Sequence, residues 1–98
     1  MSVVLDVRFR LTSGAIFSGR ANDLSLSGIF VESDQRLAFG TKLEVILVLP
    51  GSAAPLQLPG VVRWSKAHGF GVQFGLLGAR VTHELTCFLR NEQAMSAR

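Results

Sequence analysis

Apolar and polar residues alternate along most of the first three quarters of the chain. In the opening segment, Val3, Val7 and Leu11 mark the apolar phase, and Asp6 and Arg8 mark the polar one. A period of two is typical of a strand with one buried face. The pattern predicts six strands in all, at residues 3–12, 15–21, 28–32, 41–49, 56–65 and 70–74.

The same pattern indicates which side chains form the core. Phe9, Phe70 and Phe74 fall on the apolar phase of their strands. Trp64 could stack on a base, but we expect it in the core, because it shares its phase with three aliphatic residues of the fifth strand, Leu56, Leu58 and Val62. Proline lacks a ladder donor and glycine weakens a strand, so residues 59–60 predict a bulge or a delayed start of the strand.

Helical periodicity is confined to the C-terminal part of the sequence. Val81, Leu85, Phe88 and Leu89 recur at the spacing of one helical stripe. We predict a helix at about residues 79–91 and fraying of the residues that follow. The whole pattern favours an all-β fold with a C-terminal helix. We expect a small six-stranded antiparallel β-barrel at about residues 3–75, because closure removes unpaired strand edges.

Composition limits the class of protein. The chain has 98 residues, of which 48% are hydrophobic and 17% charged. These values predict a single folded domain over residues 1–98 and argue against disorder. No apolar run reaches the ~20 residues of a membrane-spanning helix, and the first residues lack a secretion signal. With Cys87 as the lone cysteine, we expect a protein of the reducing cytoplasm.

Charge and hydropathy indicate the kind of partner. The net charge of +3 permits an anionic partner without requiring one. We expect no nucleic-acid polymer, because aromatic and basic residues do not interleave on one face. The mean hydropathy of +0.36 is high for a small monomer, and Ile46 and Val48 occupy a strand face that a solvated sheet leaves polar. We therefore predict a protein partner, with a homodimer as one alternative.

Signatures of catalysis are nearly absent from the sequence. There is no Gly-x4-Gly-Lys phosphate loop and no Gly-x-Gly-x-x-Gly that opens a helix. His83 and Cys87 are two candidate metal ligands four residues apart, which is too few for a closed zinc site. Ser25 and Ser27 have no base linked to them by a sequence pattern. We expect no enzyme, no catalytic residues, no metal site and no cofactor.

The most informative segment lies between the second and third predicted strands. It reads Asp23-Leu-Ser-Leu-Ser-Gly28, of the form Asp-x-Ser-x-x-Gly. Aspartate and serine accept backbone N–H groups in turns, and Gly28 can take a φ that other residues avoid, so a simple turn explains the segment. A carboxylate, hydroxyls and backbone N–H groups could also converge on an anion or a guanine base. These six residues alone leave both interpretations open.

Three ordered motifs give the sequence a family resemblance. The first is the Asp-x-Ser-x-x-Gly segment, which is followed at once by Ile29-Phe-Val31. The second is Phe39-Gly-Thr-Lys-Leu43. The third is a set of segments in the second half of the chain: Gly60-Val-Val-Arg-Trp64, Gly69-Phe-Gly-Val-Gln-Phe74 and Leu85-x-x-Phe-Leu89. In order and spacing the chain resembles PilZ domains, many of which bind the bacterial second messenger cyclic di-GMP. The resemblance implies a six-stranded barrel with a C-terminal helix.

The sequence departs from the PilZ pattern at the family's other ligand motif. In the family, Arg-x-x-x-Arg stands just before the first strand, and its guanidinium groups bind phosphate and guanine. Here the first strand begins at about Val3, and Arg8-Phe-Arg10 has a different spacing inside a strand. Two lost charge-assisted contacts at ~1.5–3 kcal/mol each weaken binding by about a hundredfold to ten-thousandfold. Arginines in a longer native N-terminus would reverse this expectation.

The resemblance and the departure together predict the function. We expect a bacterial adaptor of the cyclic di-GMP network with weak or lost direct binding of the dinucleotide. Such an adaptor acts through protein contacts in motility, type IV pili or surface behaviour. The alternative is a genuine cyclic di-GMP receptor. In that case Asp23, Ser25 and Gly28 bind the ligand, aided by arginines of the predicted strands: Arg8, Arg10, Arg20 or Arg63.

Overall fold

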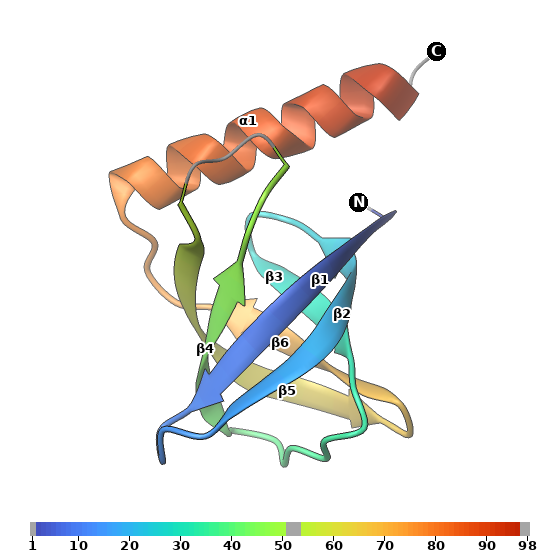
Figure 1. Cartoon of the computed structure of the whole chain (residues 1–98), viewed down its shortest axis with the longest axis vertical. Helices are drawn as coiled ribbons and strands as arrows, with labels where there is room; N and C mark the ends of the chain where they lie inside the picture. The colour runs from blue at the N-terminus through green and yellow to red at the C-terminus, as the bar shows by residue number, and fades with distance from the viewer. Residues whose placement is uncertain (1, 51–53, 97–98) are drawn as a thin grey trace.

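The computed structural model, which describes residues 2–50 and 54–96, is a closed β-barrel with one C-terminal helix (Figure 1). Its elements are β1 Ser2–Leu11, β2 Ile16–Leu24, β3 Gly28–Glu32, β4 Lys42–Leu47, β5 Leu56–Lys66, β6 Gly69–Phe74 and α1 Ala79–Ser96. The strands close in the order β1-β2-β3-β6-β5-β4, and every neighbouring pair is antiparallel. This confirms the predicted six-stranded antiparallel barrel with a C-terminal helix.

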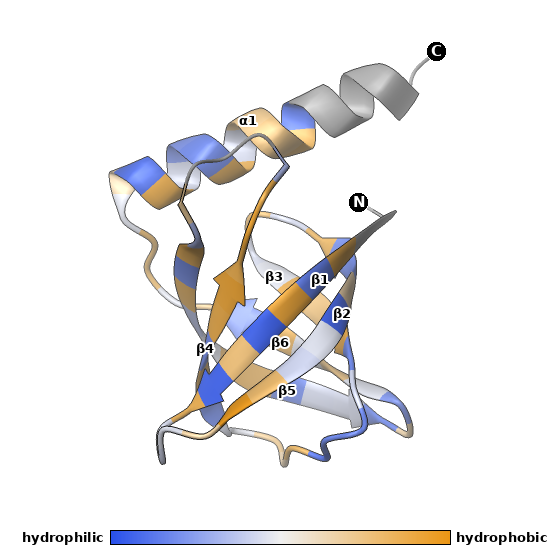
Figure 2. Cartoon of the chain, in the orientation of Figure 1, coloured by the Kyte–Doolittle hydropathy of each residue, from blue (hydrophilic) through white to orange (hydrophobic). Residues whose placement is uncertain are grey.

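The barrel is filled by the apolar phase of its strands. In Figure 2, β1 alternates between hydrophobic and hydrophilic colours along its length, as a strand with one buried face should. Phe9 is fully buried, with its ring centroid 5.2 Å from that of Phe70 and 5.8 Å from that of Phe17. Phe9, Phe70 and Phe74 are all buried, so their prediction as core residues is confirmed.

The prediction for Trp64 is wrong, and a β-bulge explains why. β5 pairs with β6 through Val62↔Val72 and then Trp64↔Gly71, so Arg63 is an extra residue in β5. An extra residue reverses the inward–outward alternation beyond it. Val62 is therefore buried, whereas the side chain of Trp64 is turned outward and is 46% exposed.

The bulge expected at residues 59–60 is also misplaced. Pro59 and Gly60 pair in unbroken register with Glu44 and Leu43 of β4. The carbonyl of Pro59 instead accepts a hydrogen bond from the N–H of Gly75 at 2.8 Å. The irregularity of this strand therefore begins after Val62, two residues beyond the expected segment.

Helix α1 lies across one end of the barrel (Figure 1). Leu85 is fully buried, and the other members of its stripe are half-buried against the core: Val81, Phe88 and Leu89. The predicted stripe is thus confirmed. The helix runs to Ser96, beyond the predicted end at residue 91, where the sequence favours fraying. No helix within residues 2–50 and 54–96 is both long and apolar enough to cross a bilayer.

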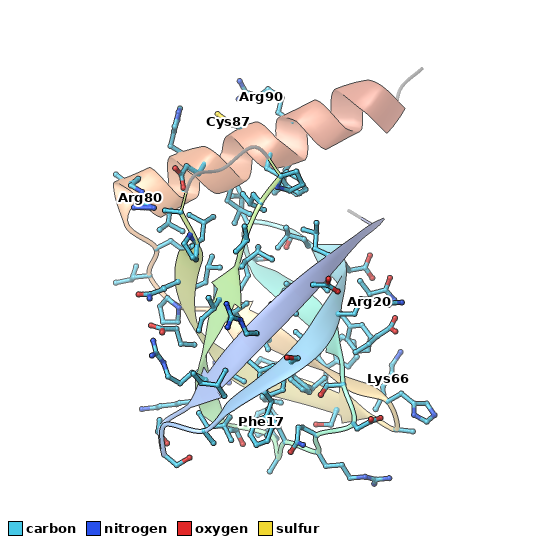
Figure 3. All side chains as sticks on the ribbon, viewed as in Figure 1. Phe17, Arg20, Lys66, Arg80, Cys87 and Arg90 are labelled. Carbon is cyan, nitrogen blue, oxygen red and sulfur yellow. The ribbon has the colours of Figure 1, made fainter. Side chains whose placement is uncertain are left out.

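The two candidate metal ligands lie on the helix, away from the core. The Sγ of Cys87 is 3.7 Å from Nε2 of His83, and both residues are exposed. Figure 3 places Cys87 on the side of α1 that faces away from the barrel. Among the residues that the structure describes, no group of three or more His, Cys, Asp or Glu residues could hold a metal ion.

Candidate functional site

The connection between β2 and β3 is a compact loop organised by Ser25. Its N–H donates to the carbonyl of Gly28 at 2.9 Å, and its Oγ accepts the N–H groups of Ser27 and Gly28 at 3.2 Å each. The N–H of Phe74 in β6 donates to the carbonyl of Ser27 at 2.9 Å. Ser25 therefore holds the loop closed, and the loop is tied to the neighbouring strand.

Gly28 is required by a close approach of two strands. A Cβ at this position would overlap the carbonyl oxygen of Val72 in β6. The described residues with positive φ are Gly14 and Gly40 alone, at 94° and 87°. The loop thus uses glycine because β3 and β6 are close, not for the unusual φ that the sequence led us to consider.

A hollow of about 450 Å³ opens beside this loop. One side comes from the end of β2 and the loop, with Asp23, Ser25 and Gly28. The other side comes from the outer faces of β5 and β6, and the full lining is Asp23, Leu24, Ser25, Ser27, Gly28, Ile29, Arg63, Trp64, Gly71, Val72 and Gln73. Segments some 40 residues apart in the sequence therefore meet at one surface.

Arg63 is the one cation, and Asp23 the one carboxylate, among the described residues that line the hollow. The Nε of Arg63 donates to Oε1 of Gln73 at 2.7 Å. Its guanidinium carbon also lies 5.9 Å from the ring centroid of Phe39. These contacts orient a planar group that can form paired hydrogen bonds with phosphate or with a purine edge.

Trp64 lies beside Arg63 in an aromatic cluster on the outside of the barrel. Its ring is stacked on Phe30, with centroids 5.1 Å apart and planes 6° from parallel. The Nζ of Lys66 lies 5.2 Å from the centroid of the Trp64 ring. A base that stacks on Trp64 would have to compete with Phe30 and Lys66 for contact with the indole ring.

The hollow gathers only part of the predicted set. Asp23, Ser25, Gly28 and Arg63 line it together, whereas the remaining arginines lie elsewhere on the barrel. Arg8 lines a different hollow on β1, β2 and β4, and Arg10 forms an ion pair with Glu44. Arg20 stands on β2 opposite Asp6 and Glu32, and its side chain projects outward in Figure 3.

Sequence reasoning missed Gln73 as a lining residue, and for Trp64 it favoured the core over base stacking. The pattern of apolar residues assigns Trp64 to the core because the bulge is not visible in that pattern. The alternating glycines at positions 69 and 71 were the available signal, since a glycine inside a strand often marks a close approach. A Cβ at Gly71 would overlap the Trp64 ring, and one at Gly69 would lie 2.6 Å from Cζ of Phe30.

The groups that line the hollow are suited to binding a ligand. A carboxylate can accept the N–H groups of a guanine edge, a guanidinium can bind phosphate, and an indole offers a stacking face. An open hollow that holds these groups beside a backbone loop suits a nucleotide-sized ligand.

The family model for the PilZ domain matches residues 1–91, and the chain belongs to this family. PilZ domains are binding and adaptor domains of the cyclic di-GMP network, and the family includes receptors for this dinucleotide. Family membership confirms the resemblance read from the sequence motifs. No curated protein matches the sequence.

Two solved structures have the same fold. The PilZ domain of CeSA from a cellulose-synthesizing bacterium superposes with a TM-score of 0.76 at 19% identity, covering 94% of this chain and 96% of that one. The Bacillus subtilis inhibitor of motility, MotI/DgrA, superposes with a TM-score of 0.82 at 21% identity. It covers 100% of this chain, which spans 51% of that protein. At these identities the likeness shows the fold.

Proposed function

We propose that this PilZ domain is a signalling adaptor of the cyclic di-GMP network whose own 98 residues bind the dinucleotide weakly or not at all. The observation that carries the proposal is the charge of the hollow. Cyclic di-GMP has two phosphates and hence two negative charges, whereas Arg63 and Asp23 give the described lining one charge of each sign. Each missing charge-assisted hydrogen bond removes about 1.5–3 kcal/mol of binding free energy.

Calorimetric titration of the 98-residue chain with cyclic di-GMP tests this proposal. We expect half-saturation at about 100 µM or above, because a single guanidinium must serve both phosphates. Cyclic di-AMP has the same phosphates and a different base edge, so it separates guanine recognition from simple charge attraction. Submicromolar binding of cyclic di-GMP would refute the weak-binding part of the proposal.

A genuine receptor is the second candidate function. It is supported by the meeting of the Asp23–Gly28 loop with Arg63 and Trp64 at one hollow. In that case Asp23→Ala should lower the affinity for cyclic di-GMP about tenfold or more, because a carboxylate that accepts two guanine N–H groups is lost. Asp34→Ala removes an exposed carboxylate that does not line the hollow, and serves as the matched control.

Ser25→Ala should also lower any affinity, but through the loop, since Ser25 Oγ holds two backbone N–H groups. Thermal unfolding distinguishes the two variants. Ser25→Ala should destabilise the fold by about 1 kcal/mol, whereas Asp23→Ala should leave it unchanged, because no hydrogen bond or ion pair from the described residues holds the Asp23 side chain. Unchanged affinity in both variants would exclude this loop as the binding site.

The adaptor proposal places the protein in the cytoplasm, where it acts through protein contacts on motility, type IV pili or surface behaviour. It is supported by large apolar side chains that the barrel leaves exposed, including Phe39 at 71% and Val48 at 51%. Deletion of the gene, followed by assays of swimming, twitching and attachment, tests this part. Normal behaviour in all three assays would contradict it.

A further inference from the structure

The outer wall formed by β4, β1 and β2 carries aliphatic side chains where a solvated sheet carries polar ones. Val48, just beyond β4, and Ile16, at the start of β2, are each 51% exposed. Ile46 is half-buried and stands beside Arg8, its cross-strand partner in β1. In the closed barrel β1 lies across from β6 and β2 across from β5, which carry the other side of the Asp23 hollow, whereas β4 is the neighbour of β5.

Two of these aliphatic residues, Ile46 and Val48, border a second hollow, of about 530 Å³. Ile46 and Val48 form one side of it, and Ser18 and Gly19 form the other. Ser18 is a small residue on the outer face of β2 and lines the recess, while a half-exposed Val48 stands beside it. The wall therefore carries a projecting apolar side chain, Val48, next to a recess that can hold an apolar side chain of similar size.

Charges of both signs lie at the same place. Asp6 and Arg8 line the hollow and are exposed, and neither side chain has a hydrogen bond or an ion pair within the described part of the chain. On the neighbouring positions, by contrast, Arg10 is paired with Glu44. The wall thus offers a carboxylate and a guanidinium at the edge of an apolar recess.

We propose that this wall is a two-fold self-association surface, on which two copies of the chain bind face to face. A two-fold interface must be self-complementary, because residue i of one copy meets residue j of the other, and the reverse. Val48 of each copy enters the recess of the other, and Asp6 of each copy pairs with Arg8 of the other. The proposal does not depend on dinucleotide binding, because its residues are absent from the Asp23 hollow.

The size of the wall fits such an interface. A standard interface covers about 800 Å² of each partner, or about one eighth of this chain's accessible surface of 6080 Å². The wall comprises the outer faces of three of the six strands. Charged residues, including Asp6 and Arg8, lie on the central strand β1 of the wall, and the exposed aliphatic residues lie at its two flanking strands.

Sedimentation equilibrium of the 98-residue chain, from about 10 µM to about 1 mM, tests the proposal. We expect the wild type to approach the dimer mass within this range, and Val48→Asp to weaken the dimer at least tenfold. Leu76→Asp places the same charge on a fully exposed leucine outside this wall, and should leave the dimer unchanged. Circular dichroism shows whether each variant remains folded.

Charge reversal tests the pairing directly, at exposed positions that tolerate substitution. Arg8→Asp should weaken the dimer at least tenfold, because it would face Asp6 of the other copy. The double variant Asp6→Arg with Arg8→Asp should recover most of the lost affinity. The proposal would be overturned by a wild type that stays monomeric at about 1 mM, or by a dimer that Val48→Asp does not weaken. It would also be overturned if Leu76→Asp weakened the dimer as much as Val48→Asp, or if the double variant recovered none of the lost affinity.

Discussion

Two glycines of β6 determine where the aromatic side chains beside the candidate hollow can lie. Gly69 and Gly71 face outward between β3 and β5, where Gly71 pairs with both Phe30 and Trp64. A methyl group at either position would meet one of the two rings. The missing side chains therefore allow Phe30 and Trp64 to stack across β6 at 5.1 Å.

Gly71→Ala should displace the Trp64 ring and destabilise the fold by about 1–3 kcal/mol, the usual cost of overpacking. Trp64 is the single tryptophan of the chain, so its fluorescence reports the displacement as a shift of the emission maximum to longer wavelength. Urea unfolding gives the change in stability. Gly78→Ala is the matched control, because a Cβ there meets no atom within 4 Å, and it should not destabilise the fold.

At the scale of single residues, the sequence predicts inward and outward positions only as far as the alternation is unbroken. Phe9 and Phe70 are predicted correctly because the pairing register is regular from Leu5 to Phe9 in β1 and along β6. Trp64 is not, because the bulge at Arg63 depends on pairing with β6. That pairing is a long-range contact, and the local pattern of apolar residues does not encode it.

At the scale of elements, helix α1 depends on its apolar stripe more than on its own propensity. Isolated helices of this length are marginal in water, and packing of one face supplies most of their stability. Leu85 is the fully buried member of the stripe, while Val81 and Phe88 are half-buried against the core. The attachment of the helix to the barrel therefore centres on Leu85.

Leu85→Ala should destabilise the protein by about 2–5 kcal/mol, since it leaves a cavity between helix and barrel. Leu76→Ala changes the same residue type at a fully exposed position, and should change stability by less than about 0.5 kcal/mol. Urea unfolding followed by circular dichroism measures both. Equal stability of the two variants would show that the helix does not depend on this contact.

The elements themselves were largely predictable, because strands and helix have different periods. The predicted third strand agrees with β3, at residues 28–32, and the other strands differ by at most three residues at either end. The spatial order β1-β2-β3-β6-β5-β4 could not be predicted in the same way, because the alternation within each strand carries no information about which strands are its neighbours. This order places β3 beside β6, and that pairing brings the Asp23 loop next to Arg63.

At the scale of the whole molecule, the barrel separates two kinds of surface. The hollow by the Asp23–Gly28 loop combines one cation, one carboxylate and an indole among its described lining residues. The β4–β1–β2 wall combines aliphatic residues with Asp6 and Arg8. The Asp-x-Ser-x-x-Gly loop was identifiable from its sequence, but only the closed barrel distinguishes Arg63, which lines its hollow, from the other strand arginines, which do not.

This separation predicts that the position of a cation, rather than the net charge, limits dinucleotide binding. Ser27 is exposed at the hollow, so Ser27→Arg places a second guanidinium beside the loop. Ser13→Arg makes the same change in the exposed β1–β2 turn, and each variant raises the net charge from +3 to +4. One added charge-assisted contact of about 1.5–3 kcal/mol corresponds to about a 10- to 150-fold gain in affinity.

Calorimetric titration with cyclic di-GMP at two salt concentrations separates a local contact from general attraction. We expect the gain for Ser27→Arg alone, and we expect most of it to persist at about 0.5 M salt, because a hydrogen-bonded pair at close contact is screened less than distant charges. A gain shared by Ser13→Arg and abolished by salt would mean that the added arginine acts through the general field of the protein. No gain in either variant would mean that the charge of the hollow is not what limits binding, and the argument for weak binding from the balance of Arg63 and Asp23 would fail.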